Sequence, residues 1–324
     1  MLLENRVAIV TGGAKGMGRS IALMFAREGC DVVVNALHIE GAEKVAEEIR
    51  ALGRRSLAIK ADISSSAEVN DMVDRTVKEF GKIDILVNNA GGVTGVKGGD
   101  TETATEEDWD KVLKVNLKGA FLVCMAVIPH MKKQKYGKII NLSSMGAVSP
   151  SVSVLHYHSA KAGVLGLTLN LAFELAPLGI YANAIVPGPV ETPFWDTLQA
   201  PGPERDAFFK ALTKKEIPLE RMGTPEDVAG PALFLASGLS DYVTGQIIYV
   251  AGGQPLSSHQ ATFLSSGCQR RSLADTNPIC RTLKRRPVRS RPSCRKATSS
   301  SLNRRSPSVR QSKLPAGLSV CDRI

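Results

Sequence analysis

One segment near the N-terminus constrains the fold of this 324-residue chain more than any other. Residues 7–10 form a continuous apolar run, residues 11–18 contain four glycines, and residues 21–27 repeat apolar side chains at helical spacing. This order predicts a buried strand, a tight turn and a helix. Glycines let the backbone approach a phosphate closely, and the first N–H groups of a helix attract an anion. The segment therefore predicts a dinucleotide site.

The same alternation continues along the chain. Further strands are predicted from apolar runs at residues 31–35, 56–60, 83–88, 138–143, 180–186 and 246–250. Helical patterns fall between them, among them residues 40–52 and 66–80. Strands that alternate with helices predict an α/β fold, here a Rossmann-type, doubly wound, seven-stranded parallel sheet with helices on both faces. Ligands bind such sheets at the carboxyl ends of the strands.

Ser144, Tyr157 and Lys161 form the pattern that suggests chemistry. Tyr157 and Lys161 are four residues apart, so in a helix they lie on one face. A cation beside the phenol favours the phenolate, and we expect it to lower the pKa of Tyr157 so that the hydroxyl exchanges protons. Ser144, at the end of a predicted strand, can hydrogen-bond the same substrate oxygen. A tyrosine and a lysine at this spacing also occur on solvated helix faces, so the rest of the sequence decides.

Residues 4–254 resemble the short-chain dehydrogenase/reductase family, and among its members the 3-oxoacyl-(acyl-carrier-protein) reductases. The resemblance rests on motifs that occur in the family's order and at its spacing. These are the glycine-rich turn at 11–18, Asn88-Asn89-Ala90-Gly91, Asn116, Ser144, Tyr157, Lys161, Pro187-Gly188, Thr192-Pro193, Gly245-Gln246 and Gly252-Gly253. The resemblance implies an enzyme that passes a hydride between a nicotinamide cofactor and a carbonyl or alcohol.

The resemblance also implies a role for each motif. Tyr157 would be the acid in carbonyl reduction and the base in alcohol oxidation, while Ser144 would polarise the carbonyl. Lys161 would hold the nicotinamide ribose, and Asn116 would position a water beside it. Cofactor contacts are expected from Gly12, Lys15, Gly16, Met17, Gly18, Asn35, Asp62, Ile63, Asn89, Ala90, Gly91, Tyr157, Lys161, Pro187, Gly188, Val190 and Thr192. No metal site is expected.

Three polar residues have structural explanations that compete with these roles. Asp62, which the resemblance places at the adenine edge, could instead cap the helix predicted after it. Asn88 could tie neighbouring strands together, and Asn116 could satisfy buried backbone groups. The sequence leaves these alternatives open.

The end of the second predicted strand bears on the choice of cofactor. An acidic residue there would hydrogen-bond the ribose 2′-hydroxyl of NAD and repel a 2′-phosphate. Residues 35–38 contain no carboxylate, the next one being Glu40, and Lys15 lies inside the glycine-rich turn. A cation there can pair with the phosphate. NADP(H) is therefore favoured and NAD(H) is the alternative, since the arginine that often follows this strand in relatives is absent.

The resemblance implies that residues 193–225 form a lid over the substrate. Phe194-Trp195 and Phe208-Phe209 could cover an acyl or apolar substrate, or could simply pack between lid and core. The expected substrate is a 3-oxoacyl thioester or a small carbonyl compound. Sugar, polyol and steroid dehydrogenases share the motifs, and a catalytically silent, cofactor-binding regulator is an alternative of another class.

Assembly and location are also expectations. Helices predicted over residues 104–133 and 155–176 are long and apolar, and relatives use the equivalent helices to assemble, so we expect a homotetramer or a homodimer. The sequence shows neither a signal peptide nor an apolar span of about 18 residues, which favours a cytoplasmic protein without a membrane span.

The composition changes near residue 254, which divides the chain into a cofactor-binding domain at 1–254 and a tail at 255–324. The tail has 15 Lys/Arg, 2 Asp and no Glu, so the positive charge of the chain belongs to it. With fourteen serines and one phenylalanine it is expected to be disordered. Its basic clusters could bind nucleic acid or an anionic surface. The tail also fits a functionless extension from a shifted reading frame or from cloning.

Overall fold

The computed structural model describes residues 1–93, 101–149, 154–198 and 200–254. All of them lie in one compact unit. The tail at 255–324 lies outside the described residues, and so do the expectations about its disorder, its partners and its origin.

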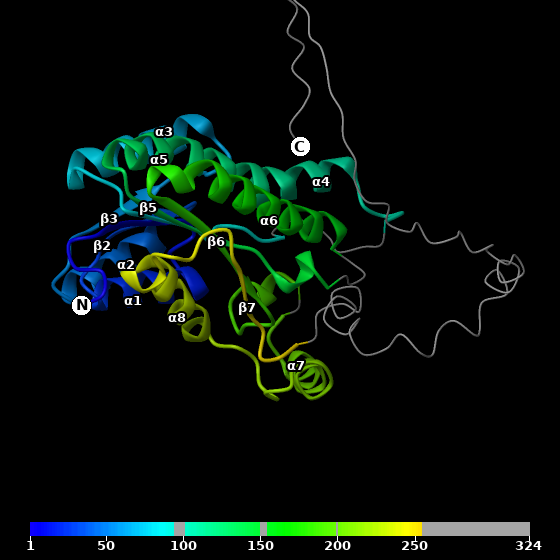
Figure 1. Cartoon of the computed structure of the whole chain (residues 1–324). Coiled ribbons are helices and arrows are strands. Elements are labelled where there is room, and N and C mark those ends of the chain that lie inside the picture. Colours follow the sequence, from blue (N-terminus) through cyan, green and yellow to red (C-terminus); the bar gives the residue numbers. More distant parts are fainter. Residues whose placement is uncertain (94–100, 150–153, 199, 255–324) are drawn as a thin grey trace, which may run out of the picture. The chain divides into compact units, whose positions relative to one another are not determined.

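Within the described residues, seven parallel strands form one sheet in the order β3-β2-β1-β4-β5-β6-β7 (Figure 1). The strands are β1 (Val7–Val10), β2 (Asp31–Ala36), β3 (Ser56–Lys60), β4 (Ile85–Asn88), β5 (Gly137–Leu142), β6 (Ile180–Pro187) and β7 (Ile247–Val250). The order reverses between β3 and β4, because the chain returns to the middle of the sheet to place β4 beside β1. The prediction of a doubly wound parallel sheet is confirmed.

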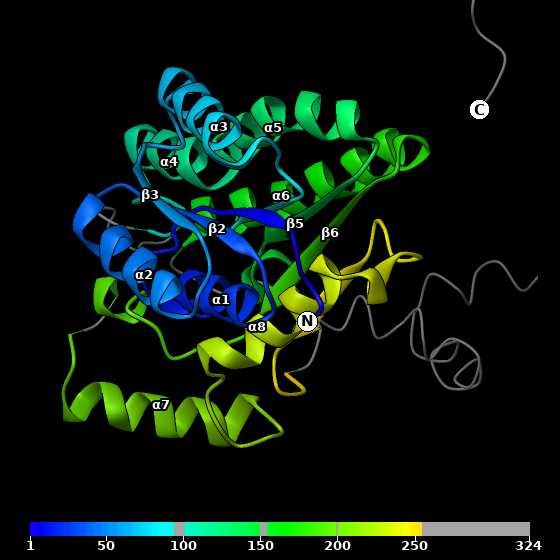
Figure 2. The same ribbon diagram turned by 90° about the vertical axis from the view of Figure 1, so that its left-hand side faces the viewer.

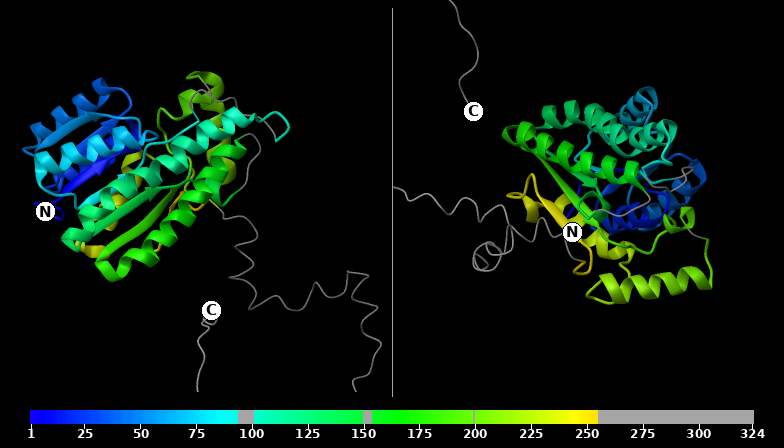
Figure 3. Two further views of the ribbon diagram at one scale, coloured as in Figure 1. Left: turned by 90° about the horizontal axis from the view of Figure 1, so that it is seen from above. Right: turned by 90° about the vertical axis from the view of Figure 1, so that its right-hand side faces the viewer.

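Helices cover both faces of this sheet (Figures 1 and 2). One face carries α1 (Gly16–Arg27), α2 (Ile39–Ala51) and α8 (Pro225–Ala236). The other carries α3 (Ser66–Phe80), α4 (Glu106–Leu113), α5 (Ala120–Gln134) and α6 (Leu155–Leu175), with α5 and α6 side by side in the view from above (Figure 3). The helix α7 (Pro203–Glu216) lies apart from both layers.

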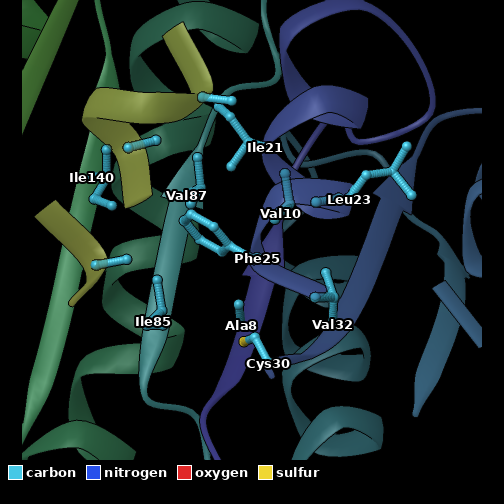
Figure 4. Packing of buried hydrophobic residues seen from close by; sticks show 14 of the residues in the cluster. Ala8, Val10, Ile21, Leu23, Phe25, Cys30, Val32, Ile85, Val87 and Ile140 are labelled. Carbon is cyan, nitrogen blue, oxygen red and sulfur yellow. The ribbon is translucent and has the colours of Figure 1, made fainter. Parts of the chain in front are cut away.

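The two faces of the sheet build two separate cores. Ala8 and Val10 pack with Phe25 of α1 on one face (Figure 4), whereas Ile9 between them packs on the other. Successive side chains of a strand point to opposite faces, so each central strand supplies both cores. This explains why the strands read as continuous apolar runs rather than as alternating ones.

The helix expected over residues 104–133 is not a single α-helix. A π-helical turn, Lys114–Gly119, separates α4 from α5. Inside it, the Asn116 side-chain Nδ2 donates to the Val112 carbonyl at 2.9 Å, which is the acceptor that the Asn116 backbone N–H would use in an α-helix. A side chain that takes this acceptor favours a wider turn. The sequence pattern carried no signal of this interruption.

Among the described residues, the helical stretch Glu106–Gln134 has the length and the apolar composition of a membrane-crossing helix. The core helices of soluble proteins can share both properties. In this fold it packs on the sheet through buried side chains of α5, among them Val123, Val127 and Met131.

Candidate active site

The junction between β5 and α6 positions the residues with catalytic chemistry. Lys161, buried on α6, donates from Nζ to the Leu142 carbonyl at 2.9 Å, and Ser143 Oγ donates to the Lys161 carbonyl at 2.8 Å. Both partners belong to the end of β5 or follow it directly. The two bonds fix the second turn of α6 against the carboxyl end of the sheet.

Ser144 and Tyr157 meet at the same place. Ser144 caps a short 3-10 turn (Met145–Ala147), where its Oγ accepts from the Gly146 N–H at 3.2 Å. The Ser144 side chain lies close enough to the Tyr157 phenol to lower its pKa, and the Lys161 amine lies 5.7 Å from the centre of the Tyr157 ring. The structure therefore brings together the three residues that the sequence spacing had singled out.

The electrostatics of Tyr157 differ from the expectation. Burial raises the pKa of Tyr157 to about 12, and the Ser144 side chain only partly opposes this. The lowered pKa expected for Tyr157 is therefore not found, because burial outweighs the effects that favour the phenolate; the Lys161 amine donates to the Leu142 carbonyl. Burial also lowers the pKa of Lys161 to about 8. At neutral pH the phenol is thus protonated and the amine is charged.

The glycine-rich turn lies between β1 and α1 and is held from β4. Thr11 Oγ1 accepts from the N–H groups of Asn89 and Ala90, at 3.0 and 3.1 Å. The Asn89 side chain donates back to the carbonyls of Thr11 and Gly12, at 3.0 and 3.1 Å. Gly12 has a φ of +62° and lies against Ala90, so a side chain there would be strained and would clash. Thr11 was not among the expected site residues, although its place directly after a buried strand could have indicated it.

Gly91 joins the nucleotide side of the site to the catalytic side. A Cβ at Gly91 would come within 2.5 Å of Asn116 Oδ1 and 3.2 Å of Lys161 Nζ. The Asn116 side chain itself bonds backbone groups only: its Oδ1 accepts from the Gly92 N–H, and its Nδ2 donates to the carbonyls of Gly92 and Val112. The structural alternative considered for Asn116 is thus what its side chain shows, and any link to water would use its backbone.

The side chain of Asn35, an expected cofactor residue, and that of Asn88 both have structural roles. The side-chain Nδ2 of Asn35 donates to the carbonyls of Ile59 and Ala61. The backbone carbonyl of Asn35 accepts from the Gly13 N–H, so Asn35 connects β2 to β3 and to the glycine-rich turn. Asn88 donates to Asn141 across the strands at 2.9 Å.

Asp62 and Ile63 lie just after β3. Asp62 Oδ1 accepts from the Ser64 N–H, whereas the residue that caps α3 is Ser65, so Asp62 is not the cap that the sequence allowed. Ile63 is buried against Gly119 of the π-helical turn. The Asp62 carboxylate keeps further acceptor sites on both oxygens.

The far wall of the site follows β6. Directly after Pro187, the last residue of β6, the Gly188 backbone N–H donates to the Val250 carbonyl. The Val190 carbonyl accepts from the indole N–H of Trp195 at 2.9 Å. Thr192 lies against Gly16 of the glycine-rich turn. Aromatic rings continue from there toward α7. Phe194 lies 5.7 Å from the Tyr157 ring, and Trp195 contacts Phe208 and Phe209.

Comparisons with known proteins agree with this geometry. Residues 12–254 match the family model described as enoyl-(acyl carrier protein) reductase. The chain belongs to the short-chain dehydrogenase/reductase family. It is 44% identical over 256 residues, 79% of this chain and 99% of the relative, to a hydroxy(phenyl)methylsuccinyl-CoA dehydrogenase subunit from Thauera aromatica. It is 40% identical over 253 residues, with 78% and 99% covered, to the 3-oxoacyl-(acyl-carrier-protein) reductase of Thermotoga maritima.

Solved structures give the same assignment. Levodione reductase superposes with a TM-score of 0.73 at 33% identity, covering 78% of this chain and 98% of that one. A 7α-hydroxysteroid dehydrogenase in complex with NADH and an oxo bile acid also gives 0.73 at 33% identity, with 78% and 96% covered. The chain is therefore an oxidoreductase of a family that uses a nicotinamide dinucleotide and acts on CH–OH or carbonyl groups.

The glycine-rich turn fits such a dinucleotide. The first turn of α1 contains no acidic residue, and Lys15 at the N-cap makes no side-chain capping bond. The first N–H groups of α1 therefore face the glycine-rich turn without a competing anion. Gly18 packs so closely on the Gly12 carbonyl that any Cβ would overlap it. These features suit a pyrophosphate lying on the backbone.

Replacing Asn89 with alanine tests the brace between β4 and the turn. Asn89→Ala removes two hydrogen bonds that hold Thr11 and Gly12, so the turn loses its fixed shape. We expect the Kd for NADPH, measured by fluorescence titration, to rise about tenfold, as for the loss of one or two net hydrogen bonds. The control is Asn70→Ala, at an exposed position of α3. Equal affinity in the two variants would contradict the brace.

Proposed function

We propose that the protein is an NADP(H)-dependent reductase that converts a ketone, either a 3-oxoacyl thioester or a small carbonyl compound, into a secondary alcohol. The observation that carries this proposal is the pair of neighbouring hydroxyls, Ser144 and Tyr157, beside the Lys161 ammonium at the carboxyl end of β5. Two hydroxyls that converge on one point suit a substrate oxygen, and a carbonyl oxygen needs a proton when it is reduced.

The nicotinamide ring, when bound, supplies the hydride. Tyr157 Oη donates the proton to the substrate oxygen, because its pKa of about 12 keeps the phenol protonated at neutral pH. Ser144 Oγ donates a hydrogen bond to the same oxygen and orients it. The Lys161 ammonium stabilises the phenolate that remains after proton transfer. A protonated phenol supports reduction as the direction favoured near neutral pH.

The NADP(H) preference rests on charge around the ribose. β2 ends at Ala36, and the chain there carries no carboxylate before Glu40. Lys15 and His38 are both exposed, at the start of α1 and of α2, and His38 makes no capping bond to its helix. A phosphate near these two helix N-termini would meet Lys15 and no acidic group from the carboxyl end of β2, and the nearest carboxylate in sequence is Glu40 in the first turn of α2.

The substrate class rests on the lid and on the relatives. Phe194, Trp195, Phe208 and Phe209 form a continuous row of rings that starts beside Tyr157, which supports an apolar acyl chain or ring next to the carbonyl. The relatives named above act, by their names, on an acyl-CoA, a 3-oxoacyl-(acyl-carrier-protein), a dione and a steroid.

The experiment that tests the function measures NADPH and NADH consumption by the purified protein. 3-Oxoacyl-CoA thioesters, cyclic diketones, oxo-steroids and ketoses are the test substrates, and mass spectrometry identifies the product. We expect NADPH-dependent formation of a secondary alcohol from a thioester or a small ketone. Turnover of none of these, in either direction, would contradict the proposal and favour the silent regulator.

The Lys161 ammonium sets a pH dependence. Its pKa of about 8 means that it is protonated below this pH and neutral above it. The rate of carbonyl reduction is therefore expected to be constant at lower pH and to fall as the pH rises through about 8, because Lys161 then loses its charge. Lys161→Arg, which stays protonated, should lose this fall even if its overall rate is lower. A wild-type profile that stays level through this pH would contradict the assignment.

Lys15 tests the choice of cofactor. Lys15→Ala removes a cation beside the proposed 2′-phosphate position, so the Kd for NADPH should rise about tenfold or more, as for a lost charge-assisted hydrogen bond. The Kd for NADH is the internal control and should change little, since NADH lacks that phosphate. Equal losses for the two nucleotides would show that Lys15 does not select between them.

We also propose that the chain forms a homotetramer or a homodimer through α5 and α6. Phe121 and Met125 on α5, and Leu169 and Phe173 on α6, are exposed apolar side chains on neighbouring helices, and Phe173 is 90% exposed. Such a face favours burial against another copy. The cytoplasmic location we propose is supported by the free, buried thiols of Cys30 and Cys124.

Light scattering tests the assembly. Phe173→Glu places a charge in the proposed interface, so the molar mass of the variant should fall to that of a smaller assembly at the concentration where the wild type is a dimer or tetramer. Leu52→Glu, at a position 44% exposed directly after α2, is the control. An unchanged mass for Phe173→Glu would place the interface elsewhere.

A further inference from the structure

Two histidines flank Tyr157, and the proposed chemistry uses neither of them. His156 is buried, and its Nδ1 accepts from the Tyr157 backbone N–H at 2.9 Å. This N–H lies in the first turn of α6, where the helix offers no partner, and Val154 at the N-cap has no side-chain acceptor. His156 thus completes the start of the helix that carries Tyr157. The side chain of His158 instead lies against Gly146.

The His158 ring lies directly on Gly146. A Cβ built on Gly146 would overlap Cδ2 of that ring and would come within 2.5 Å of Nε2. Gly146 does not have a left-handed backbone, so an alanine would suit its conformation. The contacts nearest to its Cβ position are all with His158, so the imidazole is what restricts residue 146 to glycine. His158 is half-buried, and its surroundings lower the pKa of the imidazole through burial and the neighbouring His156.

Gly146 in turn fixes the Ser144 hydroxyl. The Gly146 N–H donates to Ser144 Oγ, and an oxygen that accepts this bond keeps its own proton for a second partner. The neighbouring Tyr157 phenol, whose pKa the Ser144 side chain lowers, is the group placed to receive that proton. The contacts therefore close a ring: His158 packs on Gly146, Gly146 holds Ser144, Ser144 acts on the phenol of Tyr157, and Tyr157 precedes His158 in α6.

We propose that His158 is a positioning residue that holds the Ser144 hydroxyl in place through its contact with Gly146. This inference rests on the proposed function for its kinetic consequence, although the contact itself does not. His158 acts through Ser144 and is not a catalytic residue. Loss of one hydrogen-bond donor to a developing oxyanion costs about 10²–10³ in kcat, so a displaced Ser144 should cost a part of this.

Gly146→Ala introduces the clash without touching a catalytic side chain. We expect kcat for carbonyl reduction to fall about tenfold or more, a fraction of the loss for a removed donor, with the Kd for NADPH unchanged. Gly166→Ala is the control, because Gly166 lies on α6, the helix that carries His158, has ordinary backbone geometry and has nothing near its Cβ position. Circular dichroism melts of both variants check that they fold.

His158→Ala is the second variant, and combining it with Gly146→Ala tests whether removal of the ring restores the activity that Gly146→Ala loses. The double variant Gly146→Ala/His158→Ala should be at least as active as His158→Ala alone, because the added methyl group no longer meets a ring. In a Ser144→Ala background, Gly146→Ala should have almost no further effect on kcat, since the residue through which it acts is absent. A merely structural contact would give losses that add in that background.

A signal that does not depend on turnover separates this proposal from the proposed function. In protein labelled at the tyrosine ring carbon that bears the hydroxyl, the Tyr157 resonance, assigned with Tyr157→Phe, should move in Gly146→Ala and return toward the His158→Ala position in the double variant. If these shifts occur but no carbonyl is reduced, the positioning stands and the proposed reaction is wrong. Full kcat and an unmoved Tyr157 resonance in Gly146→Ala would overturn the positioning role.

Discussion

The tether between Lys161 and the end of β5 is the interaction on which the rest of the site depends. Lys161 is held twice, through its amine by the Leu142 carbonyl and through its backbone carbonyl by Ser143 Oγ. These bonds place the first turns of α6 over the carboxyl end of the sheet, and Tyr157 lies one turn before Lys161. Ser144 follows Ser143 directly, so the same junction supplies the hydroxyl that meets the phenol. Burial of Lys161 is also the cause of its lowered pKa.

Close backbone packing joins this junction to the nucleotide site. Gly91 leaves no room for a side chain because Asn116 and Lys161 lie against it, and Gly12 leaves none because Ala90 does. The segment after β4 is therefore enclosed between the glycine-rich turn and α6. A nucleotide on the turn and a substrate oxygen beside Tyr157 would be placed relative to one another by this segment. This close packing is possible because residues 12 and 91 are glycines.

Much of the fold followed from the sequence, and the reasons are physical. Buried parallel strands must be apolar on both faces, so all seven were visible as apolar runs, and the spacing of Tyr157 and Lys161 indicated one helix face. What the sequence did not reveal depends on tertiary contacts. The π-helical turn arises from a side chain competing for the Val112 carbonyl. The raised pKa of Tyr157 arises from burial, and Asn35 uses its amide on β3 carbonyls. The role of His158 depends on a glycine twelve positions before it, which periodicity cannot show.

The central claim is that Tyr157 transfers the proton while the remainder of the site binds and orients, and Tyr157→Phe tests it most directly. The measurement is kcat for reduction of the best ketone substrate, together with the Kd for NADPH, in wild type and variant. The account predicts a loss of about 10²–10⁴ in kcat, the usual contribution of a general acid, with NADPH binding retained. A variant that keeps its turnover to within a few-fold would contradict the account, since the phenol would then not be the proton donor.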